Sequence, residues 1–513
     1  MSLPFDPQSI AGLSVRDVID KWATIKPDSA FAIDPITNEK LTFSDLQRDC
    51  SAFASNLAAK GMMPGDSIAY AMSNGLNVLR TIFGTLYGGY LATAVNLVSG
   101  QNTIAHVLSH SNARLVFTEE QTTELVQGVV DKCAGSDRAL NLQVMNIDPS
   151  WFVQTQSDLP APHSEQDGLL MYTSGTTGVP KGVVHSHASL LAGGSNTALA
   201  HQLCEEDCTL CVLPLYHING LCVTLIGTLI SGGCIVLPRK FSVSTFWQLL
   251  RDHKCSWFSL VPTQISYLLH EAETNGHDHV GLENLRFGRS ASAPLAPDIH
   301  HAFETKFNVK IIETMGLTET AAQILSNPID GICKIGSPGI AFGNEVIIAD
   351  EKQIERPHGE EGEVIVRGPN VMHFYRKNEE ATAASLTDDG WLRTGDLGRM
   401  DDDGYVFITG RLKELIIKGG ENIAPREVDE ALYSHPDVIE AAAFARSCIQ
   451  YGQRVEAGVA VREGSALTSD SLISLCHDKI GQFKSPDKIH FFAELPKGPS
   501  GKIQRLKLAE ITE

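Results

Sequence analysis

The segment from Tyr172 to Gly182, YTSGTTGVPKG, constrains this chain more than any other. It follows a short apolar run at 168–171 that is typical of a β-strand. Glycines lack a Cβ atom, so backbone N–H groups can close around an anion, and the hydroxyl groups add further donors. Lys181 adds a mobile positive charge. The segment therefore predicts a loop that holds a polyphosphate, although a Gly/Ser/Thr cluster taken alone would favour an ordinary polar turn.

This segment differs from the Walker phosphate-binding pattern. Gly175 and Gly178 are too close together, and Gly182 follows the lysine where that pattern requires Ser or Thr. It resembles instead the phosphate loop of the AMP-forming adenylating enzymes, which include acyl-CoA synthetases, luciferases and nonribosomal adenylation domains. Further strings similar to that family follow in the family's order: PLYHINGL at 214–221, SASAPL at 290–295, TMGLTE at 314–319, WLRTGDLG at 391–398, GRLKELIIKGGENIAPREVD at 410–429 and PKGPSGKIQR at 496–505. Together they span nearly all 513 residues.

The bulk properties of the chain predict a soluble globular protein with two or more domains. Its 513 residues exceed one ordinary core, and 43% of them are apolar and 20% charged. The formal net charge of −20 argues against a nucleic-acid surface and against anionic membranes. The apolar stretch at 221–237 is interrupted by polar residues and glycines, so it favours a buried helix and strand over a membrane span. No secretory signal is recognised, and we expect a cytoplasmic location.

Alternating strand-like and helix-like segments predict an α/β fold. Apolar runs at 67–72, 115–118 and 210–215 are typical of strands, and the amphipathic segment at 76–87 is typical of a helix. This alternation predicts a large N-terminal domain of several subdomains, built from parallel α/β layers. Beyond residue 340 a β-rich portion is expected, with strands at these positions: 346–348, 362–367 and 405–410.

The C-terminal part of the chain predicts a separate α+β unit of about 100 residues, a usual size for one domain. Its expected elements are a strand at 415–417, a helix from Pro425 to Ala431, strands at 439–444 and 457–461, and a helix at 471–480. We expect a large ATP- and acid-binding domain over residues 1–410 and a small domain over residues 411–513. The resemblance implies that the small domain is mobile, with its hinge at Lys413.

The resemblance also implies an ATP site assembled from several of these strings. The residues that match nucleotide-binding positions are Thr173, Ser174, Gly175, Thr176, Thr177, Lys181, Ser292, Ala293, Pro294, Thr314, Met315, Gly316 and Thr318. The chain departs from the family at Met315, where an aromatic residue usually stacks on adenine. A thioether can make that contact instead, which leaves the affinity for adenine open.

Three charged residues match family positions around the nucleotide. Asp396 matches the acid that accepts hydrogen bonds from both ribose hydroxyls, and Arg411 matches a residue near the ribose and the α-phosphate. Glu319 matches the residue that holds Mg²⁺, a hard cation that prefers oxygen ligands. Without the surrounding string, Glu319 would be interpreted as an ordinary surface acid.

Lys502, in the string PSGKIQR, is the predicted catalytic residue for adenylation. A positive charge between a carboxylate and the α-phosphate offsets the repulsion of two anions and stabilises the transition state. The alternative is a solvated surface lysine. Gly419 and Gly420 match positions along the tunnel for the pantetheine arm of coenzyme A, where glycine permits close backbone approach. A tight turn would also explain these glycines, and both interpretations can hold together.

The acid is the least constrained part of the prediction. His217, assigned here with the catalytic residues, matches the family's gating residue beside the carboxylate. Strings at 289–297, 326–328 and 413–425 resemble the oxalate–CoA ligase branch. That branch tends to carry histidines where this chain has Asn219 and Ala322, so another small acid with a second anionic group, such as sulfoacetate, is equally supported. The candidate contacts for that second group are Asn219, Arg289 and Gln323. Arg289 could equally be a structural ion-pair partner.

Together these features predict an AMP-forming acid–CoA ligase that uses ATP, Mg²⁺ and coenzyme A on a short, dianionic carboxylic acid, without nucleic-acid or membrane partners. The alternatives are a ligase for medium-chain or aryl acids, a free-standing adenylation enzyme that loads a carrier protein, and an inactive relative that senses nucleotide. The spacing of Cys204, Cys208 and Cys211 is one used for iron–sulfur clusters. However, Cys211 opens an apolar run that favours a buried structural role.

Overall fold

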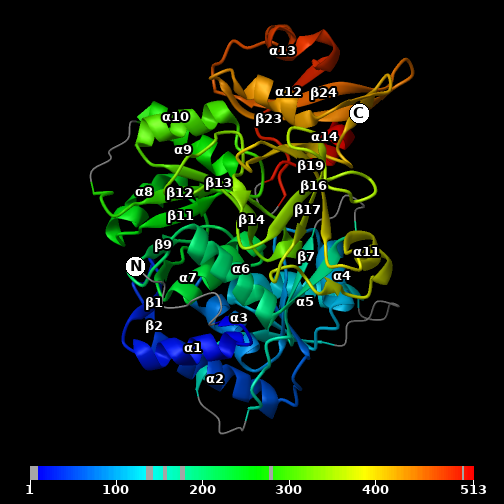
Figure 1. Ribbon diagram of the computed structural model, residues 1–513. Helices are drawn as coiled ribbons and strands as arrows, with labels where there is room; N and C mark the ends of the chain where they lie inside the picture. The colour runs from blue at the N-terminus through cyan, green and yellow to red at the C-terminus, as the bar shows by residue number, and fades with distance from the viewer. Residues whose placement is uncertain are drawn as a thin grey trace.

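The computed structural model describes residues 10–133, 142–153, 159–173, 179–275, 281–498 and 502–512. Helices and strands alternate through most of this chain, a β-rich portion follows, and the C-terminal elements form a unit of their own (Figure 1). The α/β class and the separate α+β character of the C-terminal part are confirmed.

The first parallel sheet carries the strands on either side of the glycine-rich segment. Its order is β18 (Phe374–Tyr375), β8 (Lys181–Ser186), β7 (Asp167–Thr173), β4 (Leu91–Ala94), β3 (Ser67–Ala71), β5 (Leu115–Thr118) and β6 (Gln143–Asn146). The central strands pair in parallel and are buried on both faces, which explains their continuous apolar sequences. Strands β7 and β8 are antiparallel and place Thr173 opposite Lys181.

The second sheet is also mainly parallel. Its order is β15 (Ile340–Ala341), β14 (Gln323–Ser326), β13 (Ile311–Gly316), β12 (Phe287–Ser290), β11 (Trp257–Leu260), β9 (Cys208–Leu210), β10 (Cys234–Val236), β1 (Ala30–Ile33) and β2 (Lys40–Thr42). The expected strand at 210–215 is wrong, because β9 ends at Leu210. Pro214 lacks the N–H that a ladder needs, so the chain leaves the sheet there.

Two further sheets are largely antiparallel. The β-rich portion contains β16 (Glu345–Ala349), β17 (Gly362–Arg367), β19 (Leu392–Met400) and β20 (Val406–Arg411). The C-terminal sheet contains β22 (Glu421–Ile423), β21 (Ile416–Lys418), β24 (Gly452–Val461), β23 (Val438–Cys448) and β25 (Lys488–Phe492). Each sheet has its own cluster of buried apolar side chains, so the C-terminal unit has a core separate from the rest.

Helices cover the faces of these sheets. They are α1 (Val15–Ile25), α2 (Phe43–Ala59), α3 (Leu76–Tyr87), α4 (Gln101–His110), α5 (Glu120–Cys133), α6 (His187–Ala200), α7 (Gly227–Ser231), α8 (Val243–Asp252), α9 (Pro262–Asn275), α10 (Pro297–Phe307), α11 (Glu379–Ser385), α12 (Pro425–Tyr433), α13 (Ser469–Lys484) and α14 (Arg505–Ile511). Short turns of other helix types are η2 (Pro149–Phe152), the π-helix η3 (Asn219–Ile226) and η4 (Thr318–Thr320). Within the described ranges, no helix has the length and apolar character needed to cross a membrane.

The C-terminal unit lies against α9 and α10, at one end of the molecule (Figure 1). The Tyr267 hydroxyl on α9 donates to Glu440 Oε1 on β23 at 2.5 Å, and Lys497 Nζ lies 2.7 Å from the same oxygen. Arg426 at the start of α12 donates to the carbonyls of Ile408 and Gly336 at 2.6 and 3.1 Å. The contacts of Tyr267 and Arg426 cross between the two predicted domains and place the C-terminal residues beside the large domain's surface, whereas the Lys497 contact lies within the C-terminal unit.

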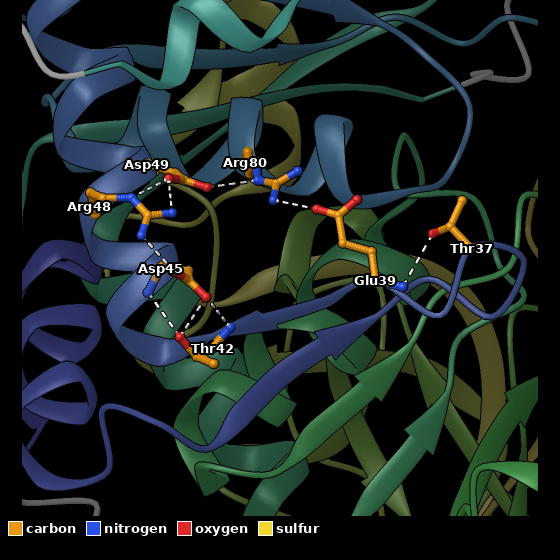
Figure 2. Close-up of polar contacts among 7 residues, drawn as sticks. All are labelled: Thr37, Glu39, Thr42, Asp45, Arg48, Asp49 and Arg80. Carbon is orange, nitrogen blue, oxygen red and sulfur yellow. Dashed lines mark hydrogen bonds and ion pairs between the residues drawn. The ribbon is translucent and has the colours of Figure 1, made fainter.

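A buried carboxylate ties α2 to α3 near the N-terminus (Figure 2). Asp49 is 3% exposed and accepts from Arg48 at 2.8 Å and from Arg80 at 2.8 Å. Arg80 also donates to Glu39 at 2.8 Å, which attaches the turn before β2. Helix α2 begins with Thr42 and Asp45, whose side chains cap each other's backbone N–H groups.

Replacing Asp49 tests how much this network contributes to the free energy of unfolding. Asp49→Ala removes the only buried carboxylate drawn in the network of Figure 2 and leaves Arg80 with one of its two carboxylate partners, the half-exposed Glu39. We expect a loss of about 3 kcal/mol in the free energy of unfolding, measured by urea denaturation. The control Arg114→Met breaks an exposed pair with Asp66 and should cost under about 0.5 kcal/mol. Equal losses in the two variants would contradict this interpretation.

Candidate functional site

A cavity of about 200 Å³ lies where the C-terminal unit meets the large domain. Its walls come from the loop after β12, the end of β13, strands β19 and β20, α12, and the segment that begins at Lys502. Parallel strands β11, β12 and β13 all end on this side, because the carboxyl ends of parallel strands meet at one edge of a sheet. Such an edge is the usual binding crevice of an open α/β sheet.

The residues predicted for the adenine and acyl walls do line this cavity. They are Ser292, Ala293, Pro294, Thr314, Met315 and Gly316. Gly316 is required by close packing, since a Cβ atom there would lie 2.3 Å from the carbonyl oxygen of Ala322. Ser292 has φ of 73°, a backbone conformation uncommon outside glycine that often occurs at binding sites.

Asp396 and Arg411 face each other across neighbouring strands at the cavity. They are register partners on β19 and β20, and Arg411 Nε donates to Asp396 Oδ1 at 2.5 Å. Arg411 Nη2 lies 3.3 Å from the second carboxylate oxygen. Burial acts against the charge on Arg411, but the Asp396 carboxylate outweighs it and raises the pKa of the guanidinium. The Arg411 guanidinium therefore stays charged beside the cavity.

Lys502 lines the same cavity from the C-terminal side. Its carbonyl accepts from the backbone N–H of Gly498 at 2.7 Å, and Arg505 on the next turn pairs with the buried Asp429. Burial, together with the nearby charge of Arg411, lowers the pKa of Lys502. The lysine is thus not a solvated surface residue in this arrangement of the domains.

A second cluster of charged and polar residues lies around Glu319 on η4. Tyr375 donates its hydroxyl to Glu319 Oε1 at 2.7 Å, and the Lys181 ammonium lies 4.2 Å from the centre of the Tyr375 ring. Burial lowers the pKa of Lys181, and Glu319 opposes that shift. Lys413 adds a further positive charge nearby from the exposed turn after β20. The structure thus places Lys181 near Glu319 and Lys413, whereas the sequence analysis gave Lys413 only the role of a hinge.

Thr318 is held from below by His185. The Nε2–H of His185 donates to the Thr318 carbonyl at 2.7 Å, and Nδ1 lies 3.1 Å from the Ser189 hydroxyl. Thr173, in the first part of the glycine-rich segment, is the last residue of β7. The remaining predicted phosphate contacts, Ser174, Gly175, Thr176 and Thr177, lie outside the described residues.

Arg289 is the most deeply buried cation predicted for the site, at 1% exposure. Its Nη1 donates to Asn219 Oδ1 at 2.8 Å and to Ser259 Oγ at 3.0 Å, and its Nη2 lies 3.4 Å from Gln323 Oε1. Burial lowers the pKa of Arg289 to about 9. The three predicted contacts for a distal anion therefore do meet. Among the described residues, no ion pair of Arg289 with a carboxylate is found, so nothing supports the structural ion-pair alternative.

His217 lies in the loop between β9 and the π-helix η3. Burial lowers the pKa of His217 to about 4, so the ring is neutral at pH 7. The next turn is tight, since a Cβ atom on Gly220 would lie 2.4 Å from the carbonyl oxygen of Pro214. The wide π-helix then turns Asn219 toward Arg289, and such helices are frequent at functional sites.

Some predicted residues lie away from the cavity. Gly419 and Gly420 form the turn between β21 and β22, with φ of 61° and 89°. Both values favour glycine in a two-residue hairpin turn. Among the cysteines, Cys211 is buried with its thiol 3.5 Å from the Leu213 carbonyl, whereas Cys208 lies near Cys255 instead. The described residues contain no group of three or more ligands suited to a metal ion.

Sequence reasoning missed several residues around the site. Ser259 and Glu313 are polar residues inside apolar strands, a signal that could have identified them. Glu313 lines the cavity, with one carboxylate oxygen 3.0 Å from the Leu295 N–H, and burial raises the pKa of Glu313. Thr197 on α6 and Tyr375 on β18 stand in no recognisable motif, so only the fold brings them to the site.

Comparison with known proteins identifies relatives over nearly the whole chain. Two family models match, described as AMP-binding enzyme over residues 19–376 and AMP-binding enzyme C-terminal domain over residues 427–502. A sulfoacetate–CoA ligase from Cupriavidus necator is 42% identical over 487 residues, 94% of each chain. An oxalate–CoA ligase from Arabidopsis thaliana is 34% identical over 88% of this chain and 89% of its own. The crystal structure of ATP-bound MatB from Rhodopseudomonas palustris superposes with a TM-score of 0.88 at 25% identity, covering 97% of this chain and 99% of that one.

Protonation of His185 should make the free energy of unfolding depend on pH. Burial lowers the pKa of His185 to about 4, from 6.5 when unfolded. The unfolded chain therefore binds the proton more readily, and stability is complete above pH 6.5 and falls as pH drops toward 4. We expect His185→Asn to lose roughly 2 kcal/mol of the wild-type difference in free energy of unfolding between pH 7 and pH 4.5. Parallel pH profiles for the two proteins, measured by urea denaturation, would exclude this role.

Proposed function

Since the chain belongs to the AMP-binding enzyme family and is an AMP-forming acid–CoA ligase, we propose a class for its acid substrate. The proposed acid is short and carries a second anionic group, as sulfoacetate and oxalate do. One observation carries the proposal: Arg289 is buried against neutral partners beside the cavity wall. Asn219 connects Arg289 to the cavity wall. Its Nδ2 donates at 3.3 Å to the hydroxyl of Ser292, a residue that lines the cavity. A buried cation is costly unless it is paired, and the second anion of the acid would pair it.

In the proposed first half-reaction, a carboxylate oxygen of the acid attacks the α-phosphorus of ATP. The bond to the β-phosphate oxygen breaks, pyrophosphate leaves, and an acyl-adenylate forms. Lys502 reaches the cavity, where its charge would offset the repulsion between carboxylate and phosphate. Asp396 would accept hydrogen bonds from the ribose hydroxyls, and Arg411 orients that carboxylate through its two contacts.

Glu319 suits a magnesium ion because it supplies hard carboxylate oxygens, one of which is fixed by Tyr375. When bound, Mg²⁺ would neutralise charge on the triphosphate. Lys181 stands next to Glu319 and would contact the same phosphates together with the glycine-rich segment. His217, neutral at pH 7, would border the reacting carboxylate without competing for it as a second cation.

In the proposed second half-reaction, the thiol of coenzyme A attacks the acyl carbon, loses its proton, and releases AMP as the carbon–oxygen bond breaks. Lys502 would have to leave the cavity for the thiol to approach. We assign that movement to a rotation of residues 411–513 about Lys413, in the exposed turn between β20 and β21. The rotation would bring the Gly419–Gly420 turn to the tunnel for the pantetheine arm.

Lys502→Ala should separate the two half-reactions. We expect adenylate formation, measured as pyrophosphate release, to fall by at least about 100-fold, because the variant loses the charge between the two anions. Thioester formation from a supplied acyl-adenylate should stay within about threefold of wild type. The control Lys507→Ala, an exposed lysine five residues further along, should affect neither rate. Equal losses in both half-reactions would remove Lys502 from its adenylation role.

Arg289→Met tests the nature of the acid. We expect KM for sulfoacetate or oxalate to rise by about 100-fold, while KM for propionate changes by less than about threefold, because only the dianions use the guanidinium. Arg286→Met is the matched control, since Arg286 lies three residues earlier and pairs with Asp207. If octanoate has a higher kcat/KM than sulfoacetate, oxalate and malonate in the wild type, the small-acid proposal is wrong, and the CoA-ligase assignment stands.

A further inference from the structure

Three arginines of this protein differ in whether a carboxylate pairs with them. Arg411 pairs with Asp396 and Arg505 pairs with Asp429, and in both cases the carboxylate outweighs burial and raises the pKa of the guanidinium. Arg289 is more deeply buried, at 1% exposure, and burial lowers its pKa with no carboxylate among the described residues to oppose the shift. At about 9 the pKa of Arg289 still leaves the side chain protonated at pH 7. One buried cation thus keeps its charge without a countercharge among the described residues.

The partners of Arg289 are neutral amides and a hydroxyl from three different elements. Asn219 on η3 and Gln323 on β14 both turn their side-chain oxygen toward the guanidinium. The Ser259 hydroxyl on β11 lies 3.1 Å from Asn219 Oδ1, and the Thr197 hydroxyl on α6 lies 3.0 Å from Gln323 Oε1. Amide oxygens satisfy hydrogen-bond donors, but they do not neutralise a charge.

Two hydrogen-bond donors in this cluster lack an acceptor within the described part of the chain. Arg289 Nε and Gln323 Nε2 are buried and have no hydrogen-bond partner among the described residues. A buried donor left without an acceptor costs about 1–3 kcal/mol. A ligand that brings acceptor oxygens and negative charge would satisfy both donors and the guanidinium at once.

We infer that Gln323 and Asn219 act as a charge filter, in which their neutrality, rather than their hydrogen bonds, selects an acid that carries its own second negative charge. This inference rests on the proposed function and deepens it by naming the residues that set the charge class. A carboxylate at either position would neutralise Arg289 from within the protein. The pocket would then repel a dianionic acid and favour a monoanionic acid of the same length.

Gln323→Glu tests the filter because it replaces NH₂ by O⁻ at nearly constant volume. The matched variant Gln323→Leu removes the same amide without adding charge. With sulfoacetate, we expect KM in the pyrophosphate-release assay to rise about 100-fold for Gln323→Glu and about tenfold for Gln323→Leu. With propionate, kcat/KM should rise for Gln323→Glu alone. The melting temperature of Gln323→Glu should also exceed that of wild type, because a buried cation gains its partner.

Three results would overturn the filter: equal effects of Gln323→Glu and Gln323→Leu on sulfoacetate, no gain with propionate, or a melting temperature at or below wild type. Asn219→Asp makes the same change on the other side of Arg289 and decides the question if Gln323→Glu does not fold. The Arg289→Met variant distinguishes a failure of the role proposed for Arg289 from a failure of the filter alone. If Arg289→Met keeps the dianion preference, the assignment of Arg289 to the second anionic group fails, and the filter fails with it. If Arg289→Met loses that preference while Gln323→Glu behaves like Gln323→Leu, only the filter fails. The proposed acid class itself fails if the wild type prefers octanoate.

Discussion

The parallel register of β11, β12 and β13 decides where the polar groups of the site lie. Ser259 is the register partner of Arg289, and Ser290 is the partner of Glu313. Because side chains alternate between the faces of a strand, one residue of slip would move Arg289 to the opposite face of the sheet. The buried apolar neighbours on both faces hold the register, so the core and the polar contacts of Arg289 depend on the same strand pairing.

Local electrostatics at the site oppose the charge of the whole molecule. The chain carries a formal net charge of −20, yet Arg411 and Lys502 line one cavity, and Lys181 lies near a further lysine, Lys413. Burial lowers the pKa of both lysines, which shows that desolvation acts against this concentration of cations. Bound nucleotide and acid would supply the missing negative charge. In the proposed function, bound anions complete the site, and Arg289 is assigned to the second anionic group of the acid.

Much of the fold and of the nucleotide site could be predicted from local patterns. The helix at 76–87 has its expected bounds, because its apolar spacing and flanking glycines are local signals. Six predicted wall residues do line the cavity, since each lies in a motif whose turn chemistry demands particular residues. The strand expected at 210–215 was wrong because periodicity outweighed Pro214 in that prediction. Thr197 could not be predicted, because its contact with Gln323 spans 126 residues of sequence.

The sequence by itself determined the family, the α/β class and the identity of most charged groups, because glycine-rich turns, apolar periodicity and charged motifs are written in consecutive residues. Only the tertiary structure decided which of those charges are paired. From the sequence alone, Arg289 could be either an ion-pair partner or an anion-binding residue. The fold surrounds it with Asn219, Ser259 and Gln323 and brings no carboxylate among the described residues into pairing distance. Pairing is a property of distance and burial, and both arise only when strands far apart in sequence pack together.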